Sequence, residues 1–250
     1  MNILCLVKQV PDTLEVRLSS DLTLQRDFVA QVLNPADESA VELGLQLRDE
    51  HGGRVTVMTM GPKRAEAMLR ELMARGADEA VLLTSPAFAG ADTLATARAL
   101  AAAAKALGPF DLMLFGRRAA DGETGQVGPM TAALLDIPCV PQVIRAEVSG
   151  DMLTADQLTE DGAVTWACAL PAALTLCEWQ YPLRLPSLRG LKRAREAAVR
   201  CLSPEHLGLD PAHLGLKGSP TRVIRVDARA AGNRSTRWIT AEEALEVVPW

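Results

Sequence analysis

The sequence has few of the residues that build metal sites, nucleophilic triads and disulfide frameworks. It contains 5 cysteines and 3 histidines in 250 residues. The cysteines are widely scattered and none forms a Cys-x-x-Cys pair, so we expect neither a disulfide framework nor a zinc site. The histidines lie far apart in loop-like sequence, which disfavours a histidine-centred triad or metal site. Scattered cysteines without disulfide or zinc spacing are consistent with a reducing cytoplasm.

The sequence also lacks the features that nucleic acids and membranes require. Its net charge is −5, and no basic stripe dominates any segment, so nucleic acid is not an expected partner. No apolar run reaches the length of a membrane span. The opening residues, MNILCLVKQV, have neither a basic region nor a small-residue cleavage site, and are typical of a buried first strand rather than a signal peptide. We therefore expect a cytoplasmic protein without membrane insertion.

Short apolar runs alternate with helix-like segments through the first 135 residues. The runs cover residues 2–7, 54–60, 79–83 and 111–115, and the helix-like segments cover residues 36–49, 63–75, 93–107 and 124–135. Strands that are apolar almost throughout suit a sheet buried on both faces. We therefore predict an α/β fold with a doubly wound, mostly parallel sheet and right-handed crossovers.

The alternation changes after Pro138. Three short strands separated by turns are expected over residues 142–148, 152–158 and 164–170, and a buried strand over 172–177 returns to the sheet. The later sequence is rich in Pro, Arg and Leu. It predicts an extended arm with little core of its own over residues 203–237 and a short helix over 240–248, capped by Thr240.

Three loops follow or lie close to strand ends. The longest, FGRRAADGETGQVGP at residues 115–129, runs from a strand into a helix, where backbone N–H groups and the helix N-terminus favour an anion. Its residues Asp121 and Glu123 would bind ribose hydroxyls or cap the helix, and Thr124 and Gln126 would donate to phosphate. The loop is neither GxGxxG nor GxxxxGKS, so its spacing indicates an anion-tolerant loop and no more. A plain capped turn stays open as an alternative.

The other two loops are Asn34-Pro35-Ala36-Asp37, with Asp37 as the expected helix cap, and Met60-Gly61-Pro62. Each alone is typical of a simple entry into a helix. Because all three loops are expected at one edge of the sheet, together they favour a binding pocket.

These segments, in this order, resemble the β subunit of electron transfer flavoproteins. The resemblance runs from MNILCLVKQVPDT through the Asn34 loop, Gly61-Pro62 and Arg75-Gly76-Ala77-Asp78 to GRRAADGETGQVGP, and on to Gln180–Ser187. It covers residues 1–190, and the long loop is its most specific part. The resemblance implies an adenine-nucleotide-binding α/β fold over residues 1–190. It also implies an α-subunit partner that carries FAD, against which a C-terminal arm over residues 191–250 would pack.

Within the family, one branch binds AMP in the β subunit, and the bifurcating and nitrogen-fixation branch binds a second FAD that accepts hydride from NADH. DGETGQVGP is closer to the second form, and Gly122 and Gly125 replace larger side chains, so FAD is favoured over AMP. Arg117 and Arg118 stand where a Lys-Gln or Arg-Gln pair is usual; they would reach a pyrophosphate or be solvated. Carried over by position, the pocket uses Leu6, Asn34, Pro35, Ala36, Asp37, Met60, Gly61, Gly116, Arg117, Arg118, Ala119, Ala120, Asp121, Gly122, Glu123, Thr124, Gly125, Gln126 and Val127.

The segment at residues 178–190 resembles the loop by which this subunit docks on a redox partner, a dehydrogenase or a quinone reductase. Leu185 matches the anchoring leucine, with Leu183 and Pro186 beside it. Packing of these leucines on the core or on the α subunit is the alternative. The residues before Tyr181 depart from the usual Asn-Glu-Pro, which leaves the partner open. The four tryptophans are assigned to packing rather than to flavin stacking.

The flavin would carry the redox chemistry, so no catalytic side chain or metal is expected in this chain. Two other functions remain as alternatives. An adenylyl-transferring enzyme would need an HxGH or SGGxDS motif, which the sequence lacks. A non-redox AMP- or ATP-binding regulatory protein would have no use for the long arm after Pro186.

Overall fold

The computed structural model describes residues 1–12 and 30–224. The helix predicted over residues 240–248, and Trp238 and Trp250, lie outside these residues. Among the described helices, none is long and apolar enough to span a membrane.

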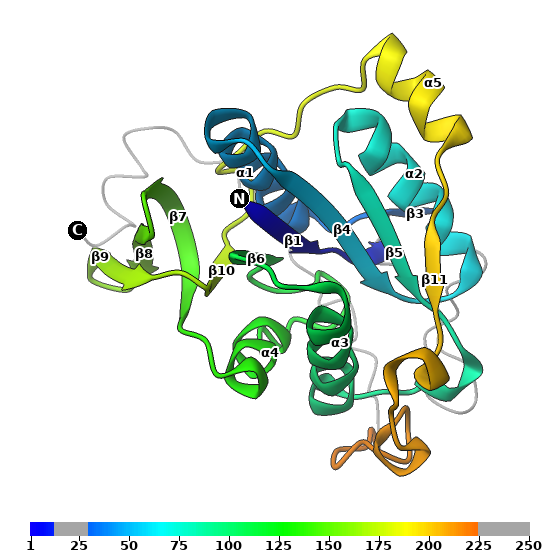
Figure 1. Cartoon of the computed structure of the whole chain (residues 1–250). Coiled ribbons are helices and arrows are strands. Elements are labelled where there is room, and N and C mark those ends of the chain that lie inside the picture. Colours follow the sequence, from blue (N-terminus) through cyan, green and yellow to red (C-terminus); the bar gives the residue numbers. More distant parts are fainter. Residues whose placement is uncertain (13–29, 225–250) are drawn as a thin grey trace, which may run out of the picture.

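A nine-stranded sheet forms the centre of the fold (Figure 1). Its strand order is β11-β5-β4-β1-β6-β10-β7-β8-β9, parallel from β11 to β7 and antiparallel from β7 to β9. The strands are β1 Asn2–Leu6, β4 Arg54–Met60, β5 Glu79–Leu83, β6 Leu112–Gly116, β7 Cys139–Ser149, β8 Met152–Thr159, β9 Gly162–Ala169, β10 Ala172–Leu176 and β11 Arg200–Leu202. The predicted mostly parallel α/β fold is confirmed, as is the return of β10 into the sheet.

Helices cover both faces of the sheet. The helices α1 (Pro35–His51) and α2 (Glu66–Arg75) lie above it in Figure 1, and α3 (Thr93–Leu107) and α4 (Val127–Leu135) lie below. Alternate residues of β1 enter separate cores: Ile3 packs with the α1 and α2 side, and Leu4 packs with the α3 side. Two buried faces explain why the parallel strands are apolar almost throughout.

Two elements near the end of the described chain were not predicted. Helix α5 (Leu188–Glu196) packs on α2, and β11 extends the sheet beside β5. Polar contacts secure α5: Arg193 Nη2 donates to the carbonyls of Met73 and Ala77 at 2.9 and 3.1 Å, and the Ser187 hydroxyl accepts from Gly190 N at 2.9 Å. The buried residues of α5, Gly190 and Ala194, are small, and its leucines are exposed, so its apolar pattern does not mark the buried face.

Shorter elements also differ from expectation. The strands β2 (Gln9–Pro11) and β3 (Gln31–Leu33) form an antiparallel pair that was not predicted. The 3₁₀ turns are η2 Lys63–Ala65, η3 Pro86–Phe88, η4 Pro204–Leu207 and η5 Pro211–His213. Within the arm expected over residues 203–237, Leu214 is buried in the main core, against the α3 side of the sheet.

The strand order places a switch point between β1 and β6. The chain moves outward from β1 to β4 and β5, then returns to the other side of β1 as β6. In open α/β sheets, ligands bind outside the carboxyl ends of the strands at such a point. The loops that follow β1 and β6 are therefore the first place to look for a site.

Candidate functional site

Asp37 ties together the two loops at the switch point. Its Oδ2 accepts a hydrogen bond from the backbone N–H of Lys8, just after β1, at 2.7 Å. Its Oδ1 accepts one from Gly116 N, at the end of β6, at 3.1 Å. The expected role of Asp37 as the cap of α1 is wrong, because its carboxylate joins two strand ends instead.

Asn34 holds the long loop against the start of α1. Its buried side-chain amide donates to the carbonyl of Arg118 at 2.9 Å and to Asp37 Oδ1 at 3.0 Å, and its Oδ1 accepts from Ala120 N at 3.0 Å. Two of the loops that the sequence singled out therefore form one structure. The side chains of Asn34 and Asp37 hold the backbone of the long loop in place through hydrogen bonds to Arg118, Ala120 and Gly116.

The buried carboxyl of Asp37 is electrostatically unusual. Removal from water raises its pKa from 3.8 to about 7, against the opposing effect of hydrogen bonds from Asn34, Lys8 and Gly116 and of the Lys8 charge. The pKa of this carboxyl therefore lies near neutral pH. The same carboxyl is hydrogen-bonded to the backbone just after β1 and at the end of β6.

The charged side chains of the long loop are paired within the chain. Lys8 Nζ lies 2.5 Å from Asp121 Oδ1. Arg117 Nε lies 2.7 Å from Glu178 Oε2, and Arg118 Nε lies 3.5 Å from Glu178 Oε1. Burial alone would raise the pKa of the Glu178 carboxyl, but the two guanidinium charges help to hold it below its ordinary value.

Lys8 and Glu178 are contacts that the sequence analysis missed. Glu178 follows β10, which lies beside β6 with Leu176 opposite Gly116. Only the order of the strands in the sheet brings Glu178 to the arginines. The charge of Arg117 and Arg118, which the sequence left either solvated or phosphate-binding, is thus partly balanced by a residue outside the loop.

The loop ends in the N-terminus of α4. The helix starts at Val127, three residues later than predicted, because Gly125 has a φ of 63° and so stands outside helical geometry. The first N–H groups of a helix have no partner within it and favour an anion. The Gln126 side chain accepts a hydrogen bond from the Thr93 hydroxyl at 3.0 Å, which fixes this end of the loop to the start of α3.

The remaining predicted pocket residues lie along the same edge. Leu6 is buried at the end of β1, in register with Met58 of β4. Met60 ends β4, and Gly61 N donates to the Leu83 carbonyl at 3.0 Å. The structure therefore brings all three loops to the carboxyl edge, as the sequence predicted. A separate cavity of about 450 Å³ lies at the opposite edge, lined in part by Asn2, Arg54, Glu79 and Arg200.

The predicted docking segment is anchored at one end and exposed at its tip. Arg184 forms ion pairs with Glu42 at 3.0 Å and with Asp49 at 2.7 Å. Beside it, Leu183 packs against the core, whereas Leu185 is 83% exposed. Of the two leucines, Leu183 therefore contributes to packing and Leu185 is available at the surface.

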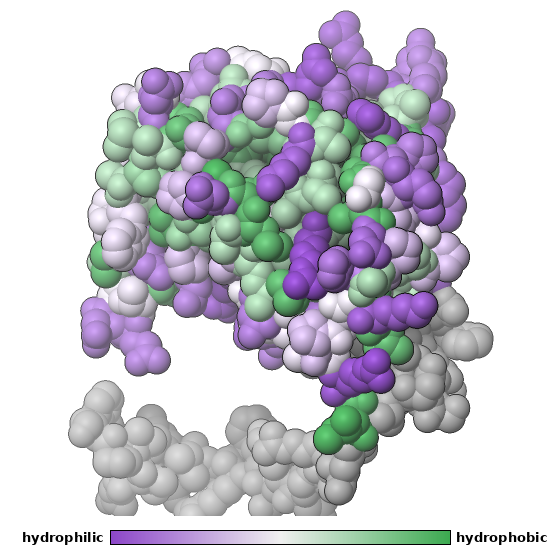
Figure 2. All heavy atoms as spheres, turned by 60° about the horizontal axis from the view of Figure 1, so that its bottom comes forward, coloured by the Kyte–Doolittle hydropathy of each residue, from purple (hydrophilic) through white to green (hydrophobic). Residues whose placement is uncertain are grey.

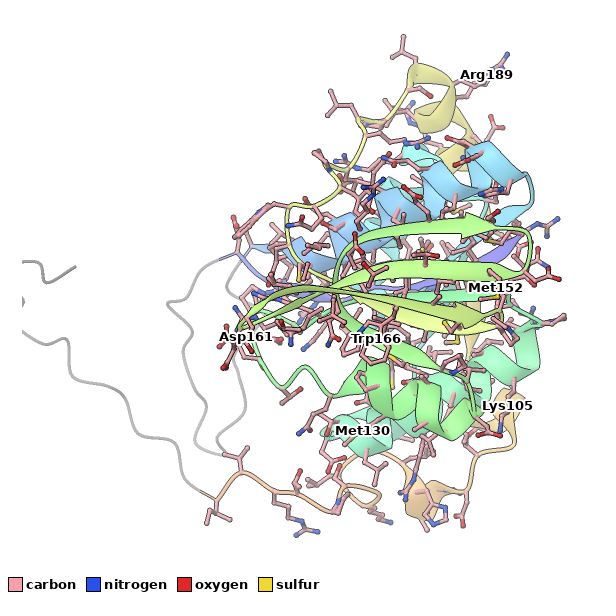
Figure 3. All side chains as sticks on the ribbon, turned by 90° about the vertical axis from the view of Figure 1, so that its left-hand side faces the viewer. Lys105, Met130, Met152, Asp161, Trp166 and Arg189 are labelled. Carbon is pink, nitrogen blue, oxygen red and sulfur yellow. The ribbon has the colours of Figure 1, made fainter. Side chains whose placement is uncertain are left out.

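Two tryptophans are not packed in the core of this chain. Trp179 is 80% exposed and Trp166 is 51% exposed, so neither fills the core of this chain. Trp166 lies on β9, between the turn at Asp161 and Met152 (Figure 3). Apolar side chains also gather in the middle of the surface that appears when the bottom of Figure 1 is turned forward, with hydrophilic ones around them (Figure 2). The chain therefore presents apolar surface in more than one place.

Comparison with known proteins places this fold and edge in context. Residues 21–203 match the family model of the Electron transfer flavoprotein domain. The Electron transfer flavoprotein subunit beta of Thermoanaerobacterium thermosaccharolyticum is 46% identical over 226 residues, which cover 90% of this chain and 86% of the relative. The Caffeyl-CoA reductase-Etf complex subunit CarD of Acetobacterium woodii is 42% identical, with 90% and 87% covered. Protein FixA of Azorhizobium caulinodans is 39% identical, with 92% and 85% covered.

Proposed function

The chain belongs to the electron transfer flavoprotein family, and from this premise we propose that it is the β subunit of a heterodimer and binds an adenine nucleotide at its carboxyl edge. The observation that carries the proposal is the joining of the two loops by Asp37 and Asn34 at the β1–β6 switch point. That joint fixes the start of the long loop, which leads into the N-terminus of α4, where a phosphate would lie.

The residues at this edge fit the phosphate and ribose of a nucleotide. The N–H groups at the start of α4, near Gly125, Gln126 and Val127, would hold phosphate, and Arg117 and Arg118 would add charge. A Cβ built on Gly122 meets nothing within 4 Å, so the loop leaves open space there. A flavin bound in this way would supply the electron-transfer chemistry, while the protein would bind and orient it and exclude competing reactions.

We favour FAD over AMP as the nucleotide of this chain. The DGETGQVGP form of the loop and the space at Gly122 support a pyrophosphate in addition to the adenosine part. Similarity to CarD and to FixA supports the same branch. In that branch the chain would take electrons from NADH or a dehydrogenase and pass them on with the α subunit.

Cofactor analysis of the copurified pair tests this directly. We expect acid extraction to release two FAD and no AMP per pair of subunits. One FAD with one AMP would retain the heterodimer but reject FAD in this chain. A colourless protein with no second chain would contradict the proposed function altogether.

The docking segment supplies a second test of the proposal. An exposed leucine on a loop held by Arg184 and Pro186 loses little entropy when it enters a partner's pocket. We expect Leu185→Ser to slow electron exchange with the partner dehydrogenase or quinone reductase about tenfold, because a buried interface anchor is typically worth 1–2 kcal/mol or more. The rate is measured with the purified pair and its partner.

Leu188→Ser is the matched control, since Leu188 is 87% exposed and stands three residues away at the start of α5. It should leave the rate within about twofold of the parent, and both variants should melt at the parent's temperature. Equal slowing by the two variants would argue against Leu185 as the anchor.

The α subunit needs a surface of its own. On β9, the edge strand of the antiparallel end, Val164 and Trp166 are 43% and 51% exposed. Large apolar side chains on an edge strand are unusual in a chain that works alone. We propose this end of the sheet as a surface that the α subunit covers. The arm proposed over residues 191–250 would meet the α subunit elsewhere, because its first part, with most of α5 and β11, lies against α2 and β5 at the opposite end of the sheet.

A further inference from the structure

Glu178 stands between the loop proposed for the nucleotide and the segment proposed for docking. Strands β6 and β10 are parallel neighbours, and the backbone N–H of Arg117, just after β6, donates to the carbonyl of Leu176 at 2.8 Å. Glu178 follows Leu176 by two residues. The first arginine of one loop and the first carboxylate of the other therefore leave the sheet side by side.

One carboxylate balances two guanidiniums at this point. Glu178 lies 2.7 Å from Arg117 and 3.5 Å from Arg118, and its side chain is only 14% exposed. The two arginines and Glu178 together carry one net positive charge, and the exposed carboxylate of Glu123 also faces Arg118, at 3.6 Å. Because Arg117 and Glu178 are only 27% and 14% exposed, salt screens this pair less than it screens surface pairs, whereas Arg118 is 41% exposed.

The contact with Arg117 is close but poorly aligned. Arg117 Nε is buried, and its N–H points at no acceptor among the described residues, although Glu178 Oε2 is 2.7 Å away. A buried donor without an aligned acceptor is unfavourable, and phosphate oxygens match the guanidinium fork well. Glu178 thus neutralises Arg117 without a well-aligned hydrogen bond from Nε, so a phosphate that aligns better would displace it.

The segment beyond Glu178 is held in place almost at once. The backbone N–H groups of Gln180 and Tyr181 both donate to the hydroxyl of Ser39, at 3.2 and 3.4 Å, and Ser39 is fully buried in α1. Between this anchor and Glu178 lies only Trp179, which is exposed and has a φ of 62°. A displacement of Glu178 would therefore move Trp179, whereas Gln180 and Tyr181 would stay fixed by Ser39.

We propose that Glu178 is a built-in competitor for the phosphate of the bound nucleotide, and that its displacement from Arg117 and Arg118 is transmitted to Trp179. Two anions at the same guanidinium repel each other, most strongly beside the buried Nε of Arg117, so phosphate and carboxylate exclude one another there. This inference rests on the proposed nucleotide site. It adds that the site discriminates by phosphate charge and signals its occupation to the start of the docking segment.

The affinity of the full chain for adenosine, AMP and ADP, measured by calorimetry, tests the competition. We expect Glu178→Gln to tighten AMP and ADP about tenfold and to leave adenosine unchanged, because only phosphate competes with the carboxylate. Glu147→Gln is the matched control: it removes the carboxylate of an exposed pair with Arg145 on β7, with the same change in net charge. It should alter none of the three affinities.

Tryptophan fluorescence gives an independent readout of the displacement. The difference between the parent chain and Trp179→Phe isolates the emission of Trp179. We expect AMP, but not adenosine, to change that emission in the parent, and Glu178→Gln to abolish the response. Unchanged AMP affinity in Glu178→Gln, or an equal gain for adenosine, would overturn this inference alone. A parent chain that binds none of the three, and no FAD, would overturn the proposed function and this inference with it.

Discussion

Replacing Asp37 with asparagine is expected to lower the free energy of unfolding by about 3 kcal/mol, a large loss for a single isosteric change. The two oxygens of Asp37 accept N–H groups from three residues: Lys8 on one oxygen, Gly116 and Asn34 on the other. An amide has one oxygen, so either orientation of its NH₂ group faces a buried N–H donor and leaves it unsatisfied. Urea unfolding of the purified chain at pH 8, above the pKa of about 7 of the Asp37 carboxyl, measures the loss for the ionised carboxylate.

Asp111→Asn is the matched control for this change. Its carboxylate accepts the Asn2 N–H at 2.6 Å at the opposite edge of the sheet, where Asn2 is exposed and Asp111 is half-buried. One amide oxygen still serves that donor, so we expect a cost below about 1 kcal/mol. Equal costs for the two variants would mean that the joint between β1 and β6 has no special weight.

The loss of unfolding free energy caused by Asp37→Asn should also depend on pH. The carboxyl has a pKa of 3.8 when unfolded and about 7 when folded, raised chiefly by burial. Between these values the folded state holds a proton that the unfolded state has released, so this contribution to stability is complete below about pH 4 and is lost as pH rises through 7. Asparagine does not titrate. The stability difference between parent and variant should therefore shrink from pH 5 to pH 8, and a difference that grew would show the carboxyl ionised in the fold.

The sheet could be predicted from the sequence because its parallel strands bury side chains on both faces. Ile3 and Leu4 enter separate cores, so the pattern of β1 is a continuous apolar run with one interpretation. Strand β11 gives no such signal. Its residues Arg200 and Cys201 are exposed, and it belongs to the sheet through backbone pairing with β5, which leaves no mark in the sequence.

The place of the site was also predictable, but the roles of its residues were not. Strand ends with glycine-containing loops identify the carboxyl edge. By contrast, an aspartate in the first turn of a helix has the same sequence pattern whether it caps that helix or bridges two strands, and Asp37 does the second. The partner of Arg117 depends on β10 lying beside β6. Such pairs follow from strand order, and no local pattern encodes strand order.

Substitution of Gly116 by alanine is expected to be nearly as damaging as the loss of the Asp37 carboxylate, for a steric reason. A Cβ at Gly116 would lie 2.2 Å from Asp37 Oδ1 and 2.8 Å from the Cβ of Ala36, both held in the buried first turn of α1. Neither atom is the free end of a flexible chain, so the end of β6 must shift away from α1. Overpacking of this kind costs about 1–3 kcal/mol, and we expect the upper end, with loss of the Gly116–Asp37 hydrogen bond.

Gly122→Ala separates this steric effect from the general cost of changing glycine in the loop. A Cβ there meets nothing within 4 Å, so we expect a change in unfolding free energy within about 0.5 kcal/mol. Both variants are compared with the parent by urea unfolding and by the cofactor content of the copurified pair. Gly116→Ala should lose stability and cofactor together, because the same contact shapes the loop. A stable Gly116→Ala that kept its nucleotide would show that the loop does not depend on the close packing of β6 against α1.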